Sequence, residues 1–219
     1  MSWVGLAFTP KRREKMWRMI DGGDESAASR HDRIRDAALK VFAAHGTSDA
    51  TLQMIAEAAG VSVGLIQHHF GSKDGLIAAV DGHALAVIAT TMSAPLPVSA
   101  AEAIIEAGRR VNFLIAERLS VVDYFARMLV TGTAAGTTVF DALVTIGVGQ
   151  WQQLADSGAT DADVDVTWAA LNPLILTLGT IILRRHLDRY LPEPFTTRAQ
   201  LQRWERAVNT LIARGQLRG

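Results

Sequence analysis

Two glycines, Gly60 and Gly71, divide residues 52–75 of this chain into short helical pieces. The segment reads LQMIAEAAGVSVGLIQHHFGSKDG, with apolar side chains at helical spacing on both sides of Gly60. Thr51 and Ser62 stand where N-caps are expected, and each glycine supplies the backbone freedom that ends a helix. Small alanines before Gly60 let two helices cross closely. The pattern predicts a helix-turn-helix unit.

Helical periodicity continues through the rest of the chain, and no segment alternates as a half-buried strand does, so we predict an all-α fold. A capping box at Ser99 and Glu102 and a cap at Thr160 predict the starts of two long helices, the second kinked at Pro173. The further helices are expected over residues 29–45, 72–88, 99–119, 121–131, 138–156, 160–190 and 197–214.

The helix pattern suggests three parts: an N-terminal extension over 1–28, a helix-turn-helix domain over 29–75, and a larger helical domain over 76–219. Two interpretations of the extension stay open. In one, a short helix carries the cluster of Lys11, Arg12, Arg13 and Lys15 to a phosphate backbone or a minor groove; in the other, the segment is a disordered tail or the product of a mis-assigned start codon.

Composition limits the remaining possibilities. The chain has no cysteine, its 22 basic residues balance 22 acidic ones, and its first residues lack the basic start and apolar run of an export signal. We therefore expect a cytoplasmic protein whose nucleic-acid contacts, if it makes them, come from a local patch. Residues 166–183 carry no charge, but they include Asn172, Pro173 and Gly179, so a buried or interface helix fits them better than a membrane span and no membrane partner is expected.

One face of the second short helix is too polar for a core. If Ile66 and Phe70 point inward, the opposite face presents Gln67, which suits an adenine edge, and Leu65, which suits a thymine methyl group. Hydroxyls, His68, Lys73 and helix N-termini suit phosphates. The predicted DNA-binding residues are Thr51, Gln53, Ser62, Val63, Gly64, Leu65, Gln67, His68 and Lys73.

The segment AEAAGVSVGLIQHHFGSKDGL resembles the DNA-binding segment of the tetracycline-repressor (TetR) family of bacterial transcription regulators. The resemblance covers 29 to about 80 and rests on the Ala-Ala-Gly-Val-Ser turn, the Gly-x-x-x-x-His-Phe helix and the Ser-Lys start of the next helix. It implies a larger helical domain for ligand binding and dimerisation. Many members have aromatic residues, often tyrosine, where this chain has Gln67 and His68, so we expect Gln67 to read a base instead.

Signatures of catalysis or metal binding are absent from the sequence. There is no G-x-S-x-G motif and no P-loop, and the alternating Asp161, Asp163 and Asp165 lack the glycine and the closing glutamate of a calcium loop. The neighbouring His68 and His69 do not have the spacing that places two imidazoles on one helical face. We expect no enzyme activity, no catalytic residues, no cofactor and no metal.

The larger domain is expected to form a homodimer that sets the spacing of two half-sites in a palindromic operator. Apolar stripes on the last two long helices predict an interface formed by Leu174, Leu178, Ile181, Ile182, Trp204, Val208 and Leu211. Ordinary core packing is the alternative for the same residues.

A small-molecule effector is expected to bind between helices of this domain. Its predicted binding residues are Asn112, Phe113, Tyr124, Phe125, Met128, Phe140, Trp151, Trp168 and Asn172. Because no charged cluster marks such a pocket, we expect an uncharged, largely apolar effector.

The sequence favours a dimeric repressor that the effector releases from double-stranded DNA. Two alternatives remain at this point. An activator of the same fold would have the same sequence features, and a helical carrier or interaction module would have the same larger domain without binding DNA.

Overall fold

A computed structural model describes residues 29–217 of the chain, and within that range it is helical throughout except for turns and one isolated bridge between Thr160 and Leu217. The predicted all-α class is confirmed. The expectations for the 1–28 extension lie outside the described residues.

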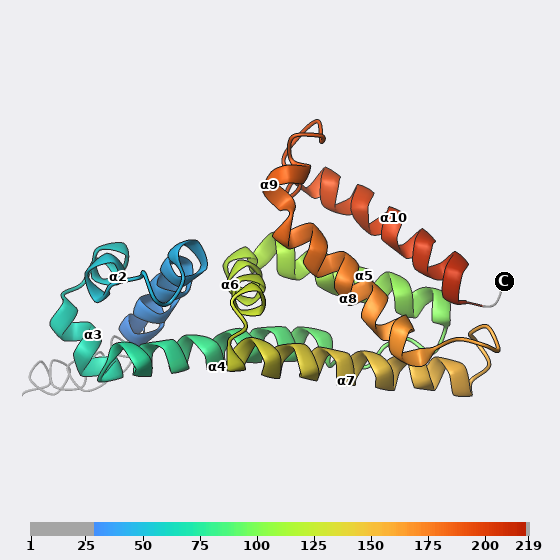
Figure 1. Ribbon diagram of the computed structural model, residues 1–219, viewed down its shortest axis with the longest axis horizontal. Coiled ribbons are helices and arrows are strands. Elements are labelled where there is room, and N and C mark those ends of the chain that lie inside the picture. The colour runs from blue at the N-terminus through green and yellow to red at the C-terminus, as the bar shows by residue number, and fades with distance from the viewer. Residues whose placement is uncertain (1–28, 218–219) are drawn as a thin grey trace, which may run out of the picture.

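The chain runs through a helix whose described part covers 29–45 and then through the labelled helices of Figure 1. These are α2 (Leu52–Ala59), α3 (Val63–Phe70), α4 (Lys73–Met92), α5 (Ala100–Glu117), α6 (Leu119–Val130), α7 (Ala134–Asp156), α8 (Val166–Ile182), α9 (Arg184–Leu187) and α10 (Arg198–Gln216).

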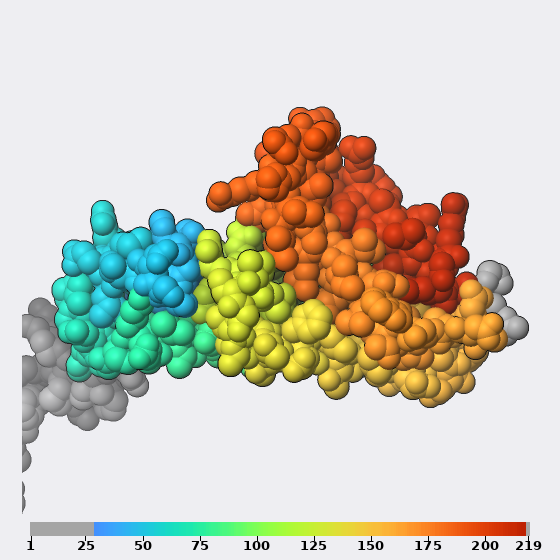
Figure 2. Space-filling model, viewed as in Figure 1, coloured from blue at the N-terminus to red at the C-terminus, as the bar shows by residue number. Residues whose placement is uncertain are grey.

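The helices form two groups joined by α4. Figure 1 shows the 29–45 helix, α2 and α3 at one end, with α4 extending from them toward the helices at the other end. Along its length α4 contacts α3, α5, α6 and α7. In the space-filling view of Figure 2, α6 lies between the blue-green group and the orange and red helices.

A continuous apolar core runs beneath the junction of the two groups. It includes Phe42 of the first described helix, Ile66 of α3, Val80 of α4 and Phe125 of α6, all of them buried. Two further clusters lie among α5, α6, α7, α8 and α10. The larger group of helices therefore contains several separate apolar clusters, and a cavity lies among its helices.

Two predicted helix starts are wrong, because α7 begins at Ala134 instead of 138 and α8 begins at Val166 instead of directly after Thr160. The predicted 160–190 helix is instead α8 followed by the short α9, and its first turn is capped by Asp165, whose carboxylate accepts the Trp168 N–H at 3.1 Å. The predicted capping box also fails, because Ser99 precedes α5 without accepting a hydrogen bond through its hydroxyl.

Helix α4 is the one described helix long and apolar enough to cross a membrane by length and composition. Its buried residues Leu76, Val80, Ala84 and Ile88 belong to the core described above. Helix α8, which contains the uncharged 166–182 stretch, is shorter and contacts α6, α7 and α10. Both helices pack as parts of a helical protein interior.

Candidate nucleic-acid interface and cavity

Helix α3 buries one side and exposes the other. Ile66 is completely buried, whereas Gly64, Gln67 and His68 are exposed. Val63 and Leu65 are half-buried and pack against the core. The outward face of α3 therefore presents mainly the bare backbone of Gly64, the side-chain amide of Gln67 and the imidazole of His68.

Serine and threonine hydroxyls fix the first turns of three successive helices. The Thr51 hydroxyl accepts the Met54 N–H at 3.2 Å, Ser62 accepts that of Leu65 at 3.2 Å, and Ser72 accepts that of Gly75 at 3.0 Å. Each hydroxyl keeps its own hydrogen for donation. Thr51 and Ser62 are exposed, so an anion near these helix N-termini meets both backbone N–H groups and hydroxyl donors.

Gly60 and Gly71 end α2 and α3 with positive φ angles of 64° and 73°. L-residues with a side chain rarely adopt this conformation, so the glycines close the two helices at little cost.

Lys73 connects the start of α4 to the loop before α2. Its Nζ donates to the Ser48 carbonyl oxygen at 3.2 Å, and the side chain is half-buried. Gln53, in the first turn of α2, is exposed. The two residues lie in the first turns of the helices that Thr51 and Ser72 cap. Cationic and polar hydrogen-bond donors are therefore concentrated at one end of the molecule.

Three histidines and a phenylalanine form an aromatic cluster beside α3. The His31 ring stacks on Phe70 with centroids 4.4 Å apart, and His69 lies 6.1 Å from His31 and 5.5 Å from His68. Burial, followed by the nearby His68, His31 and Arg30, lowers the pKa of His69. Sequence reasoning missed His31, because nothing in its local pattern indicates that the 29–45 helix reaches the end of α3.

Residues 34–80 match the family described as "Bacterial regulatory proteins, tetR family". These residues therefore form a TetR-family domain. The predicted resemblance is thereby confirmed.

Curated TetR-family relatives match mainly over this domain. The chain is 48% identical over 66 residues to the transcriptional regulatory protein RaaS of Mycobacterium tuberculosis, covering 30% of this chain and 31% of RaaS. It is 41% identical over 71 residues to the transcriptional repressor AcnR of Corynebacterium efficiens, covering 32% of this chain and 37% of AcnR. The matches thus span about a third of these relatives.

Solved structures resemble the TetR-family chain over most of its length. The ketosteroid transcriptional regulator KstR2 of Mycobacterium tuberculosis has a TM-score of 0.65 at 18% identity, covering 87% of this chain and 96% of KstR2. AibR, solved in complex with isovaleryl coenzyme A and operator DNA, has a TM-score of 0.64 at 17% identity, covering 83% and 97%. At these identities the likeness shows the fold alone.

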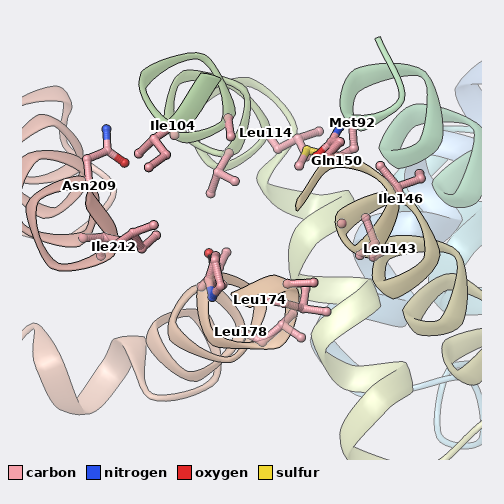
Figure 3. Close-up of a pocket in the computed structure, with 18 of the residues that line it drawn as sticks. Met92, Ile104, Leu114, Leu143, Ile146, Gln150, Leu174, Leu178, Asn209 and Ile212 are labelled. Carbon is pink, nitrogen blue, oxygen red and sulfur yellow. Dashed lines mark hydrogen bonds between the residues drawn. The ribbon is translucent and has the colours of Figure 1, made fainter. Parts of the chain in front are cut away.

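An apolar cavity of about 190 Å³ lies among the helices of that group. Figure 3 shows side chains from α4, α5, α7, α8 and α10 around it, including Met92, Ile104, Leu143, Leu174 and Ile212. Ile88 and Met92 bring the far end of α4 into its wall. The helix that begins beside α3 therefore ends at this cavity.

The residues predicted for effector binding are dispersed. Phe125 and Trp151 line the cavity, and Asn112 lies at the α5–α10 contact. Tyr124, Met128 and Phe140 belong to or pack against the main core, whereas Phe113, Trp168 and Asn172 are exposed.

The residues predicted for the dimer interface also separate into two sets. Five of them line the cavity: Leu174, Leu178, Ile181, Trp204 and Val208. Ile182 and Leu211 are exposed, at 46% and 62%.

Helix α6 is joined to its neighbours by polar contacts that the sequence did not reveal. Tyr124 donates to Asp81 of α4 at 2.7 Å, and burial together with this bond raises the pKa of Tyr124. Arg127 donates to the carbonyl oxygens of Ala43 and Ala44 at 2.9 and 2.8 Å, at the end of the 29–45 helix. These bonds connect the cavity side of the molecule to the DNA-binding domain.

Proposed function

We propose that this TetR-family chain is a cytoplasmic transcription regulator that binds double-stranded DNA, most simply as a repressor. The observation that carries the proposal is the outward face of α3, where Gly64, Gln67 and His68 are exposed while Ile66 is buried. A single helix with such a face fits a major groove, and a glutamine amide pairs with an adenine edge. AcnR, which resembles the domain, is named a repressor.

Phosphate contacts in this proposal come from the N-terminal ends of α2, α3 and α4. Thr51, Ser62 and Lys73 lie at those ends, and the helix dipoles favour an anion there. Lys73 has to share or exchange its bond to the Ser48 carbonyl oxygen when it meets a phosphate. Val63, Leu65, Gln53 and His68 complete the proposed contact surface.

A homodimer on a palindromic operator follows from an exposed apolar stripe on α8. Trp168, Ile175 and Ile182 are seven residues apart and 55%, 50% and 46% exposed, and Leu211 of α10 is also exposed. Burying such a stripe against a second copy is favourable, and a two-fold dimer matches the symmetry of paired half-sites. The proposed interface is this stripe, with the cavity-lining residues serving the interior of each subunit.

Release by a small molecule follows from the course of α4. The helix begins next to α3 and its residues Ile88 and Met92 line the cavity, so a ligand that favours one position of α4 also favours one position of α3. A differential affinity of this kind typically gives about 1–3 kcal/mol of coupling. AibR, which is similar to this chain in fold, was solved in complex with both isovaleryl coenzyme A and operator DNA.

The test is fluorescence anisotropy of the full chain on a duplex from its own upstream region and on a scrambled duplex, at two salt concentrations. We expect binding about a hundredfold tighter to the upstream duplex, and a steep loss of affinity with salt. Gln67→Ala should weaken specific binding about tenfold or more. Gln153→Ala, at an exposed site on α7, serves as the matched control and should change nothing.

Lys73→Ala separates backbone contacts from base contacts. It should weaken binding to both duplexes and reduce the salt slope by about one unit. Equal weak binding to both duplexes, together with no enriched sequence in a random-site selection, would contradict the proposal and favour a helical ligand-binding module.

A further inference from the structure

The apolar cavity has one polar end, where α5 meets α10. Gly108 and Asn112 lie one turn apart on α5, and Glu205 and Asn209 lie one turn apart on α10. A Cβ at position 108 would meet the Asn209 side-chain amide at 2.9 Å and the Glu205 Cγ at 3.1 Å. The glycine therefore lets two polar side chains of α10 lie directly against α5. Gly108, Glu205 and Asn209 all line the cavity.

Asn112 bonds to α10 through its amide nitrogen but not through its oxygen. The Asn112 Nδ2 donates to the Glu205 carboxylate and, at 3.4 Å, to the Leu201 carbonyl oxygen. The Asn112 Oδ1 is buried and has no hydrogen-bond partner. A buried carbonyl oxygen without a donor is costly, because it loses its bond to water and gains nothing in return.

The cavity wall carries one negative charge and no positive one within the described residues. Glu205 is the one charged side chain among the lining residues that the structure describes between 29 and 217. The nearby Arg109 and Arg110 of α5 both pair with Glu106 instead. A carboxylate at the end of an apolar cavity attracts a cation more strongly than it would in water, because the surrounding dielectric is low.

We propose that the cavity binds molecules with an apolar body and a protonated amine. This rests on the proposed function, in which the cavity is the effector site. The ammonium group supplies up to three donors, which match the Glu205 carboxylate and the side-chain oxygen of Asn209 at the polar end of the cavity, while the apolar body lies against Ile104 and Leu174. The expectation of an uncharged effector is thereby replaced by that of a cationic one.

Three probes with the same eight-carbon tail test the charge preference directly. Octylammonium, 1-octanol and octanoate are titrated into the full chain without DNA, and the total tryptophan fluorescence, to which the cavity residues Trp151 and Trp204 contribute, is recorded. We expect octylammonium to bind about tenfold or more tightly than 1-octanol, and octanoate to bind most weakly. This comparison uses the unmodified protein, so it does not depend on the folding of a variant.

Glu205→Gln then assigns the preference to the carboxylate. The variant should lose about tenfold in affinity for octylammonium and stay within about twofold for 1-octanol, while circular dichroism confirms that it is folded. Glu102→Gln is the matched control, because Glu102 is exposed in the first turn of α5 and does not line the cavity.

The probe titration would overturn the proposal if octanoate bound as tightly as octylammonium, or if no probe showed saturable binding. An equal loss for all three probes in Glu205→Gln would also overturn it, by showing that the carboxylate only supports packing. The titration contains no DNA, so octylammonium binding combined with failure of the anisotropy test would refute the regulator and leave the ligand site standing.

Discussion

The DNA-binding domain and the cavity region differ in how far apart the residues that specify them lie in the sequence. In α2 and α3, a hydroxyl accepts a hydrogen bond from a backbone N–H three residues later, and a glycine ends the helix. The cavity, in contrast, is lined from Ile88 of α4 to Ile212 of α10. Local signals specify the first region, whereas long-range packing specifies the second.

The largest expected effect tests how rigid the locally specified region is. A Cβ at Gly75 would lie 2.1 Å from the Phe70 carbonyl oxygen, which is itself held by the Ser72 N–H at 2.8 Å. Because backbone must move, Gly75→Ala should lower the free energy of unfolding by about 3 kcal/mol, measured by urea denaturation.

Gly82→Ala is the control on the same helix. A Cβ there meets nothing within 4 Å, so this change should stabilise the protein by about 0.5–1 kcal/mol. A similar response of the two variants would show that the α3–α4 turn adjusts easily and that the contrast between the regions is smaller than the geometry indicates.

The sequence predicted the DNA-binding domain well because its signals are local. Thr51, Ser62, Gly60 and Gly71 are each readable from their neighbours, and all four take the predicted places in the structure. Which DNA groups the exposed face contacts stays a prediction. His31 escaped notice, because its stacking on Phe70 depends on how two helices pack.

The cavity was harder to predict, because helical spacing shows that a side chain is on an apolar face without showing what lies opposite. Tyr124 and Phe125 are neighbours, yet one bonds to Asp81 and the other lines the cavity. Glu205 and Asn209 were not predicted to line a cavity, because two polar residues on a charged helix have the pattern of a solvent-exposed face. Only the packing of α5 against that face makes them part of the cavity wall.

The next prediction concerns the bonds that join the two regions. Arg127→Met removes the donors to the Ala43 and Ala44 carbonyl oxygens while keeping much of the side-chain length. We expect a loss of about 2 kcal/mol in the free energy of unfolding, since hydrogen bonds from charged donors contribute more than neutral ones.

The matched change is Arg109→Met. The Arg109 side chain is 74% exposed and pairs with Glu106 on its own helix, so its removal should cost less than about 0.5 kcal/mol in urea denaturation. Equal effects of the two substitutions would mean that Arg127 is no more important to the junction than a surface ion pair.

The smallest expected effect is a pH dependence confined to the DNA-binding domain. The pKa of His69 lies below its ordinary value of 6.5 in the folded protein, because burial and then the charges of His68, His31 and Arg30 disfavour protonation. Well above pH 6.5 the ring is neutral in both states. As the pH falls below 6.5, the unfolded chain binds a proton more readily than the folded one, so stability is lost. NMR titration of the His69 ring should give a midpoint below 6.5.

The variant His69→Gln should reduce the loss of stability between pH 7.5 and 5.5, as measured by the urea midpoint at each pH. His45→Gln provides the comparison, because His45 is exposed and contributes no ring to the aromatic cluster beside α3. The prediction fails if His69→Gln leaves the pH dependence of stability unchanged and the His69 ring of the unmodified protein has a midpoint at or above 6.5. These results would show that the cluster does not disfavour protonation of His69. In that case protonation of His69 would add positive charge to the α3 end of the molecule as the pH falls, and DNA affinity rather than stability would carry the pH dependence.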